Sequence, residues 1–463
     1  MLQKLKNRYI GNKAFYRMTL AIAVPIMIQN GISNFVSMLD NIMVGSVGTE
    51  QMTGVSIVNQ LIFVFNLMIF GTVSGAGIFG AQFHGNGDHK GVRDTFRFKL
   101  ISCALMTALG AAVFLFFGDD LIRMYLQGEG AIEQIEASFG YAKQYLFIMM
   151  IGLIPFFVSQ CYSSTLRETG ETMLPMVSGI VAVIVNLCFN SLLIFGLFGL
   201  PKLGSAGAAI ATVISRFVEA AIVMLVTHMR HDKYRFIEGA FRSFRVPGHL
   251  VGGILQKGIP LVLNETLWAG GMAILNQCYS VRAFQVVSAV NISSTIANVL
   301  NVSFIAMGNA IGIIIGQMLG AGKTEEAVDA DRKLIAFSVV SSVLFAAVLF
   351  AISSVFPNIY RVEQEIRDMA TSFIRIAALC MPIGALANAC YFTLRSGGKI
   401  MVTVLFDSCY VWAIVVPLAY CLSRFTSLPI VPLFFCCQFV EIGKCIIGLI
   451  MIKSGIWIQK IVN

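Results

Sequence analysis

The sequence predicts an all-α integral membrane protein with twelve transmembrane helices arranged as two parallel six-helix repeats. Its 463 residues are 57% hydrophobic and only 12% charged, and the mean hydropathy is +0.80. Soluble domains carry about twice that share of charged residues, so a soluble globular protein is excluded. Twelve apolar runs are each long enough to cross a hydrocarbon core of ~30 Å. The runs cover residues 17–46, 52–83, 97–118, 139–165, 172–199, 205–228, 250–279, 284–318, 334–356, 367–394, 401–422 and 428–454.

Lysine and arginine residues predict the orientation of these runs. They gather in the polar segments on one side, which include the N-terminal segment, the longest polar break and the C-terminal segment. Because cytoplasmic loops are enriched in Lys and Arg, both termini are expected in the cytoplasm, with the chain a multi-pass protein of the plasma (inner) membrane. The first run is too long for the core of a signal peptide, so we expect it to remain as helix 1.

The longest polar break, residues 229–249, separates the two halves of the chain. It mixes arginine with tyrosine and phenylalanine, which is typical of an amphipathic segment at a membrane surface. The net charge of +9 could also indicate nucleic-acid binding, but lipid headgroups explain it more simply, and no nucleic-acid partner is expected. The predicted domains are an N-terminal six-helix lobe (1–228), a cytoplasmic interfacial linker (229–249) and a C-terminal six-helix lobe (250–463).

The two halves share motifs at matching places, which indicates an internal repeat. The matched pairs are Gln82 with Gln317, Thr165 with Thr393, Arg167 with Arg395, Glu219 with Glu441, and Pro25 with Pro260. Because each half has six spans, both enter the membrane from the same side, and a substrate is expected between the lobes. Proline removes a helical hydrogen bond, so Pro25 and Pro260 are predicted hinges.

Seven ionisable residues lie well within the predicted spans, where a charge is costly unless it is paired or hydrated. They are Asp40, Arg216, Glu219, Glu265, Asp407, Glu441 and Lys444. Arg216 and Glu219 are three residues apart, as are Glu441 and Lys444, which predicts two ion pairs with a structural or lobe-coupling role. Asp40, Glu265 and Asp407 have no partner at helical spacing and are predicted to be unpaired along their own helices. Asp407 is interpreted as part of an inner gate or of an ion pair at the inner face.

Asp40 is the candidate for ion coupling. Counting about 1.5 Å per residue from the outer helix ends places Asp40, Asn186, Asn190 and Thr212 at comparable depths. Their oxygens suit a proton exchanged at the carboxyl group, or a hard monovalent cation such as Na⁺. The alternatives are that Asp40 only reaches the interface, and that the Asn and Thr side chains only hold helices together.

Glu265 is predicted near the midplane of helix 7, beside Asn264 and Trp268. An acid next to an aromatic ring could bind a cationic ligand by charge and by cation–π contact. Alternatively, Glu265 hydrogen-bonds Asn264 and remains a protonated packing residue. Asn34 of helix 1 is a further candidate for lining the substrate cavity.

Several chemistries lack their sequence signals. No GxxxxGK phosphate loop, HExxH or GxSxG pattern occurs, so neither ATP as the driving force nor hydrolysis is expected. The 11 cysteines lie in apolar runs without metal-type spacing, and the five histidines lie in or beside polar loops. We therefore expect a protein that is not an enzyme and has no cofactor.

Taken together, the motifs resemble those of the multidrug and toxic compound extrusion family over essentially the whole chain. The residues that carry the resemblance are Pro25, Asp40 to Gly45, Ala81-Gln82, Leu166-Arg167 with Gly170 and Pro175, Asn186 with Asn190, and Gly204 to Thr212. The resemblance implies a V-shaped pair of lobes that exports organic cations and other amphiphiles by antiport against protons or sodium. It also implies a cation site at Asp40, Asn186, Asn190 and Thr212.

The chain departs from the family at two places. Asn190 stands where similar proteins often have an acid, which lowers the charge of the site and favours H⁺ over Na⁺ as the coupling ion. Glu265 lies nearer its proline than the helix 7 acid of the sodium-coupled branch does, and no acid occurs within helix 10. We therefore expect a monomeric proton antiporter for small amphiphilic or cationic substrates in the lipid bilayer. The alternatives are a lipid-linked oligosaccharide flippase of a related family and, with least support, a membrane-embedded enzyme.

Overall fold

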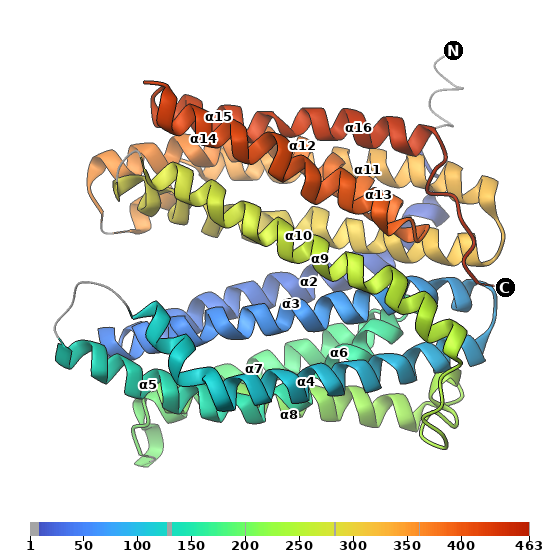
Figure 1. The fold of residues 1–463 in the computed structure, drawn as a ribbon, viewed down its shortest axis with the longest axis horizontal. Helices are drawn as coiled ribbons and strands as arrows, with labels where there is room; N and C mark the ends of the chain where they lie inside the picture. The colour runs from blue at the N-terminus through green and yellow to red at the C-terminus, as the bar shows by residue number, and fades with distance from the viewer. Residues whose placement is uncertain (1–8, 127–131, 200, 282–283, 361, 463) are drawn as a thin grey trace. The chain divides into compact units, whose positions relative to one another are not determined.

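The computed structural model describes residues 9–126, 132–199, 201–281, 284–360 and 362–462, and all regular structure in these ranges is helical (Figure 1). The helices of the first half are α2 (Lys13–Gly45), α3 (Thr49–Gly85), α4 (His89–Tyr125), α5 (Ile132–Ile151), α6 (Leu153–Glu168), α7 (Met173–Phe195) and α8 (Ser205–Met229). Those of the second half are α9 (Gly248–Ser280), α10 (Phe284–Gly320), α11 (Thr324–Ile352), α12 (Gln364–Ser396), α13 (Ile400–Val404), α14 (Val416–Phe425), α15 (Ile430–Phe439) and α16 (Glu441–Lys453).

The described helices confirm the predicted membrane architecture. Eleven helical segments are long and apolar enough to cross a membrane, or twelve when the bent pair α5 and α6 is counted as one span. These two helices meet at 46° around Gly152, and Pro155 in the first turn of α6 lacks the N–H that a continuous helix would use. The predicted span 139–165 is therefore one broken helix.

Three predicted spans begin too late. The apolar runs start at residues 97, 139 and 334, whereas α4 begins at His89, α5 at Ile132 and α11 at Thr324. At α4 the carboxylate of Asp88 accepts a hydrogen bond from the backbone N–H of Gly91 at 2.9 Å, which caps the first turn. Hydropathy detects only the apolar part of a helix, so polar first turns of this kind are missed.

The last two spans are irregular. Between α13 and α14 the chain forms two π-helical segments, Leu405–Cys409 and Val411–Val415. Between α15 and α16 the helix breaks at Val440, whose carbonyl oxygen accepts a hydrogen bond from the Tyr410 hydroxyl at 2.6 Å. Insertions of this kind re-aim the side chains around them and are frequent at functional sites.

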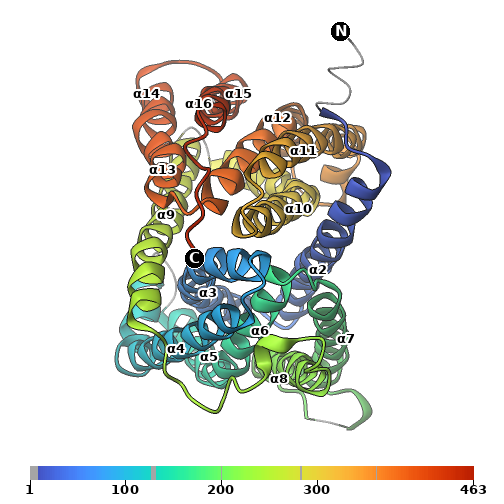
Figure 2. The same ribbon diagram turned by 90° about the vertical axis from the view of Figure 1, so that its right-hand side faces the viewer.

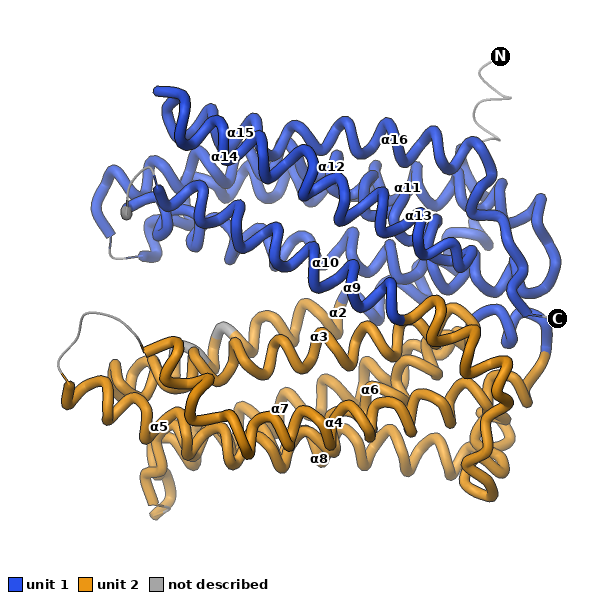
Figure 3. The backbone as a smooth tube through the Cα atoms, viewed as in Figure 1, with its two compact units in different colours: residues 1–27, 81–87, 259–463 blue, residues 28–80, 88–258 orange. Residues whose placement is uncertain are grey.

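The contacts divide the chain into two compact units, which Figure 3 colours separately. Unit 1 comprises residues 1–27, 81–87 and 259–463, and unit 2 comprises residues 28–80 and 88–258. Helices α2, α3 and α9 each contribute residues to both units. The lobe boundaries read from the sequence, 1–228, 229–249 and 250–463, stay a prediction.

Each unit is a helical bundle with its own core. In unit 1, α12 packs against α10, α11 and α16 (Figure 2), and Phe373 stacks on Phe434 with ring centroids 4.4 Å apart. In unit 2, α8 packs against α5, α6 and α7. Large apolar side chains such as Phe116 and Leu344 are more than 60% exposed, as expected of surfaces that face lipid.

The segment that follows α8 is folded onto unit 2. Phe236 is buried against Phe96, with ring centroids 5.4 Å apart, and Arg97 Nε donates a hydrogen bond to the carbonyl oxygen of Ala240 at 2.8 Å. Lys233 donates a hydrogen bond to Glu171, which raises the pKa of Lys233. The linker residues therefore pack against the ends of α4 and α6 as well as presenting exposed arginines.

Candidate functional site

The four residues predicted to bind the coupling ion lie together in unit 2. Asn190 Nδ2 donates a hydrogen bond to Asp40 Oδ1 at 2.6 Å and a second one to Asn186 Oδ1 at 3.0 Å. Asn186 Nδ2 in turn lies 3.3 Å from the hydroxyl oxygen of Thr212. Three helices, α2, α7 and α8, thus meet through one continuous chain of polar side chains.

The local sequence explains how these helices come close. Asn186 and Asn190 are one helical turn apart and share a face of α7. At Gly207 a Cβ atom would lie 2.6 Å from the carbonyl oxygen of Leu193, so only glycine permits α8 to approach α7 this closely. Asn190 and Asn186 are buried at 0% and 5% exposure, whereas Asp40 is half-buried.

One buried acceptor of the site has no partner among the described residues. The side-chain oxygen Asn190 Oδ1 is buried without a hydrogen-bond partner, while its amide nitrogen serves both Asp40 and Asn186. A buried acceptor of this kind is costly to leave unpaired. Turning the amide would aim Oδ1 at Asp40, where it could accept a proton carried by the carboxyl group or contribute an oxygen to a bound Na⁺.

The predicted pair of Arg216 and Glu219 does not form an ion pair in the described part of unit 2. The guanidinium of Arg216 lies over the ring of Phe156 at 4.9 Å and donates a hydrogen bond to the carbonyl oxygen of Gly152 at 3.3 Å. The expected direct contact was wrong, because spacing along one helix permits a pair without requiring it, although the two side chains still act on each other electrostatically. Arg216 directly contacts the break between α5 and α6.

A second polar network occupies the interior of unit 1 and corrects three further expectations. Lys444 Nζ lies 2.5 Å from Asp407 Oδ1, so Lys444 pairs with Asp407 rather than with Glu441, and Asp407 is not unpaired. Asn264, which is fully buried, donates to Asp407 Oδ2 at 2.9 Å and accepts a hydrogen bond from the Ser408 hydroxyl at 2.7 Å. Asn264 is therefore bound within the helix bundle and does not hydrogen-bond Glu265.

Glu265 has a different partner from the one the sequence suggested. The Tyr391 hydroxyl of α12 donates to Glu265 Oε1 at 2.7 Å, and Arg395 acts on the carboxylate electrostatically. Trp268 is 40% exposed on the same helix. In unit 2 the side chain of Asn34 is also exposed. Sequence reasoning missed Tyr391, although the neighbouring Thr-Leu-Arg motif had marked this end of α12 as part of the repeat.

A buried ion pair in unit 2 was also missed. Lys99 is 0% exposed and lies 2.6 Å from both carboxylate oxygens of Glu168, and it also donates to the hydroxyls of Ser164 and Thr165. The sequence placed these residues at the ends of spans, where a charge normally reaches water. Only the early start of α4 brings Lys99 into the bundle.

The predicted hinges lie inside long helices. Pro25 interrupts α2 and Pro260 interrupts α9. In both helices the chain passes from one compact unit to the other within a few residues of the proline, at 27–28 and at 258–259.

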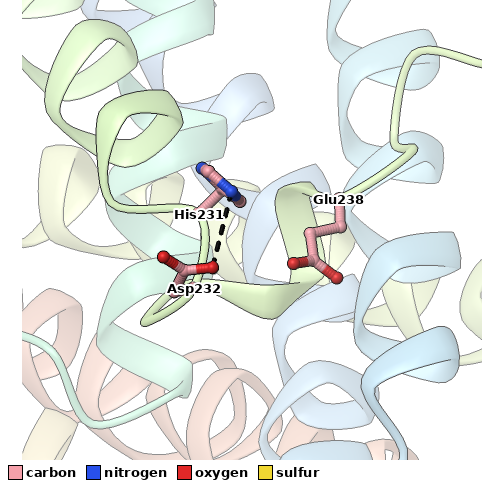
Figure 4. Close-up of side chains that lie close together, drawn as sticks. All are labelled: His231, Asp232 and Glu238. Atoms are coloured by element: carbon pink, nitrogen blue, oxygen red, sulfur yellow. Dashed lines mark ion pairs between the residues drawn. The ribbon is translucent and has the colours of Figure 1, made fainter.

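Outside the bundles, one surface group has metal-ligating side chains. His231, Asp232 and Glu238 lie close together on the exposed linker, with possible ligand atoms within 4.8 Å of one another (Figure 4). His231 Nε2 is 3.4 Å from Asp232 Oδ1. All three side chains are exposed, and nothing further in their surroundings indicates a bound ion.

Comparison with known proteins gives consistent matches over both halves of the chain. The family model MatE matches residues 25–192 and 260–421. The chain is 23% identical over 445 residues to the probable multidrug resistance protein NorM of Thermotoga maritima, covering 96% of this chain and 93% of that protein. It is also 23% identical over 409 residues to the probable multidrug resistance protein YoeA of Bacillus subtilis, covering 88% and 87%.

Solved structures share the fold. A crystal structure of MATE in complex with MaL6 matches with a TM-score of 0.86 at 16% identity, covering 97% of this chain and 98% of that one. A transporter of the MOP superfamily from Pyrococcus furiosus matches with a TM-score of 0.86 at 17% identity, covering 97% of each chain. At this level of identity the structures establish the fold alone.

Proposed function

Because the chain belongs to the MatE family of membrane transporters, we propose that it is a secondary active multidrug exporter with Asp40 as its coupling acid. In this proposal it exports organic cations and other amphiphiles by antiport against protons, using alternating access. It acts as a monomer in the plasma membrane with both termini in the cytoplasm.

The hydrogen-bonded chain from Asp40 to Thr212 is the observation that carries this proposal. As a carboxylate, Asp40 accepts a hydrogen bond from the Asn190 amide. When Asp40 binds a proton, one of its oxygens becomes a donor, and the unpartnered Asn190 Oδ1 is placed to accept it after the amide turns. Asn190 would then no longer donate a hydrogen bond to Asn186. Protonation of Asp40 on α2 would in this way change the hydrogen bonds that join α7 to α8.

Pro25 supplies the step from protonation to a change of conformation. It removes one backbone donor from α2, so the helix resists bending less there than elsewhere. A bend at Pro25 would move the end of α2 that carries Asp40, and Pro260 would act in the same way in α9. Related solved structures described as MATE in the bent and in the straight conformation support two such states.

The composition of the site favours H⁺ over Na⁺. It holds one carboxylate, and the amide nitrogen of Asn190 occupies the space between the oxygens of Asp40 and Asn186. A sodium ion needs several oxygens directed at one point, which this arrangement offers only after the amide has turned. A proton needs only the carboxyl group.

Glu265 and Trp268 are proposed to meet the cargo. Tyr391 holds the Glu265 carboxylate in place, and the exposed indole of Trp268 lies one helical turn further along α9. A carboxylate beside an aromatic face suits an organic cation.

The test uses purified protein in liposomes with separately imposed proton and sodium gradients and a fluorescent organic cation. We expect the wild type to respond to the proton gradient and Asp40→Asn to transport no faster than empty liposomes, while still binding the cation. Asp119→Asn is the control, because Asp119 is an exposed acid paired with Lys143. Wild-type rates in Asp40→Asn, or transport by the wild type that follows only the sodium gradient, would show the coupling scheme to be wrong.

A further inference from the structure

Unit 1 contains a buried carboxyl group that the proposed transport mechanism does not use. Asp331 of α11 is 1% exposed. Its Oδ1 accepts a hydrogen bond from the Thr393 hydroxyl of α12 at 2.6 Å, whereas Oδ2 is buried without a partner. None of the ion pairs among the described residues includes Asp331. The carboxyl group is therefore shielded from solvent, and no ion pair among the described residues neutralises it.

The internal repeat shows what is missing. In unit 2, the matching threonine, Thr165, also contacts a buried charge on the third helix of its half, the ammonium of Lys99. Glu168 neutralises Lys99 there. Three residues after Thr393, where the repeat would place the counterpart of Glu168, the chain has Ser396, whose hydroxyl bonds to the carbonyl oxygen of Thr393 in its own helix. Unit 1 thus keeps a buried ionisable group at this place, but none of the ion pairs among the described residues includes it.

Two opposing effects act on the proton of Asp331. Burial away from water favours the neutral acid. A short hydrogen bond from a hydroxyl, at 2.6 Å, favours the carboxylate, because O–H···O⁻ bonds have this length. A group held between two such effects is able to exchange its proton.

The surroundings of Asp331 add few other charges. On its own helix Arg332 interacts with it electrostatically, and on α12 Cys390 does so, with Tyr391 and Arg395 nearby in sequence. Helix α10, whose residues 284–320 include no titratable side chain, also packs on α11, and α2 contacts α11 through Tyr16, whose ring centroid lies 4.9 Å from that of Phe337. Asp331 lies seven residues into α11, so it is about 10 Å along the helix axis from the polar first turn.

We propose that Asp331 is a second proton-binding site, located in unit 1 and separate from Asp40. The unpartnered oxygen Oδ2 takes the proton and the carboxylate becomes a neutral carboxylic acid. Oδ1 becomes the carbonyl oxygen and keeps its hydrogen bond from Thr393. The site binds a proton whether or not Asp40 couples transport.

Infrared difference spectroscopy of the purified protein tests this directly, because a protonated carboxyl group has a carbonyl stretch that a carboxylate lacks. We expect a band from Asp331 to appear reversibly as the pH is lowered from about 9 to about 5, in addition to any band from Asp40. The Asp331 band is expected to be absent from Asp331→Asn and present in Asp40→Asn. The test of Asp331 therefore does not depend on whether Asp40 is the coupling acid. Asp329→Asn is the matched control, since Asp329 is an exposed acid on the same helix that pairs with Lys333 at 2.5 Å.

Thr393→Val keeps the test decisive if Asp331→Asn does not fold. Removing the hydroxyl frees the Asp331 carbonyl oxygen, so the same band is expected to move to higher frequency. The proposal is overturned if neither substitution alters a band that changes with pH. That result would mean that Asp331 stays protonated, or stays ionised, over the whole pH range.

Discussion

Breaking the Asp407–Lys444 pair is the sharpest test of how unit 1 is held together. The two side chains are 12% and 7% exposed, and Nζ lies 2.5 Å from Oδ1. Asp407 Oδ2 is held by Asn264, so the carboxylate has partners on both oxygens. The perturbation is Lys444→Met, which keeps the length of the side chain and removes its charge.

The magnitude follows from the distance and the burial. At an effective dielectric constant of 20, unit charges 2.5 Å apart attract each other by about 7 kcal/mol, most of which offsets the cost of burying them. Removing one charge forfeits the attraction but leaves the other charge buried. We therefore expect Lys444→Met or Asp407→Asn to lower the free energy of unfolding by about 3–5 kcal/mol. The double variant leaves no buried charge, so it should lose less than either single variant.

Unfolding by sodium dodecyl sulfate in mixed micelles, followed by circular dichroism, measures these differences. The double-mutant cycle isolates the pair, because contacts other than the pair cancel between its arms. Arg424→Met is the control, since Arg424 is an exposed cation over the ring of Tyr420 and should cost little. Additive losses in the double variant would refute the reasoning, as would a Lys444→Met protein as stable as the wild type.

Two further predictions concern the cargo and the C-terminal segment. Glu265→Gln should raise the KM for a cationic cargo and leave that for a neutral amphiphile unchanged, as measured in liposomes; equal effects on both cargoes would argue against charge recognition. A Cβ atom at Gly397 would lie 1.5 Å from the carbonyl oxygen of Trp457, so Gly397→Ala should displace the segment that Gln82 holds through Gln459 and Ile461. In a protein without its other tryptophans, the buried Trp457 should then show red-shifted fluorescence. Gly384→Ala is the control, because its Cβ atom would meet only Phe304 at 3.9 Å and should leave the spectrum unchanged. An unchanged spectrum in Gly397→Ala would mean that the position of the segment does not depend on this contact.

The sequence predicted the membrane spans well because burial in lipid imposes a simple rule on composition. A run of apolar residues long enough to cross the bilayer has to be helical, since its backbone groups find no other partners there. Interruptions follow from finer effects: the π-helical segment at Asp407 and the break at Val440 depend on contacts between helices, such as the one from Tyr410. Hydropathy carries no information about these contacts.

The candidate sites show the same division. Depth alone was enough to group four residues, because the fixed rise of a helix converts the number of residues from its end into a depth in the membrane. These residues are Asp40, Asn186, Asn190 and Thr212, and the structure joins them in one chain of hydrogen bonds. The partner of Lys444 could not be predicted in this way. Spacing along a helix suggested Glu441, but a partner on another helix competes whenever packing brings one close, and Asp407 does so.

The repeat explains why the two units are suited to different tasks. Counting from the matched prolines, the position that corresponds to Asp40 is Leu275, an apolar residue at 5% exposure. Unit 1 therefore has no acid at the position of the proposed coupling acid, and its own acids lie elsewhere: Asp407 is neutralised by Lys444, Glu265 accepts a hydrogen bond from Tyr391, and Asp331 accepts one from Thr393. Only the last two have no cation within ion-pair distance among the described residues. In the proposed scheme Glu265, which Tyr391 holds in place, meets the cationic cargo, and Asp331 takes a proton. The same repeated framework, carrying different side chains, then lets unit 2 respond to the proton gradient through Asp40 while unit 1 recognises the exported compound.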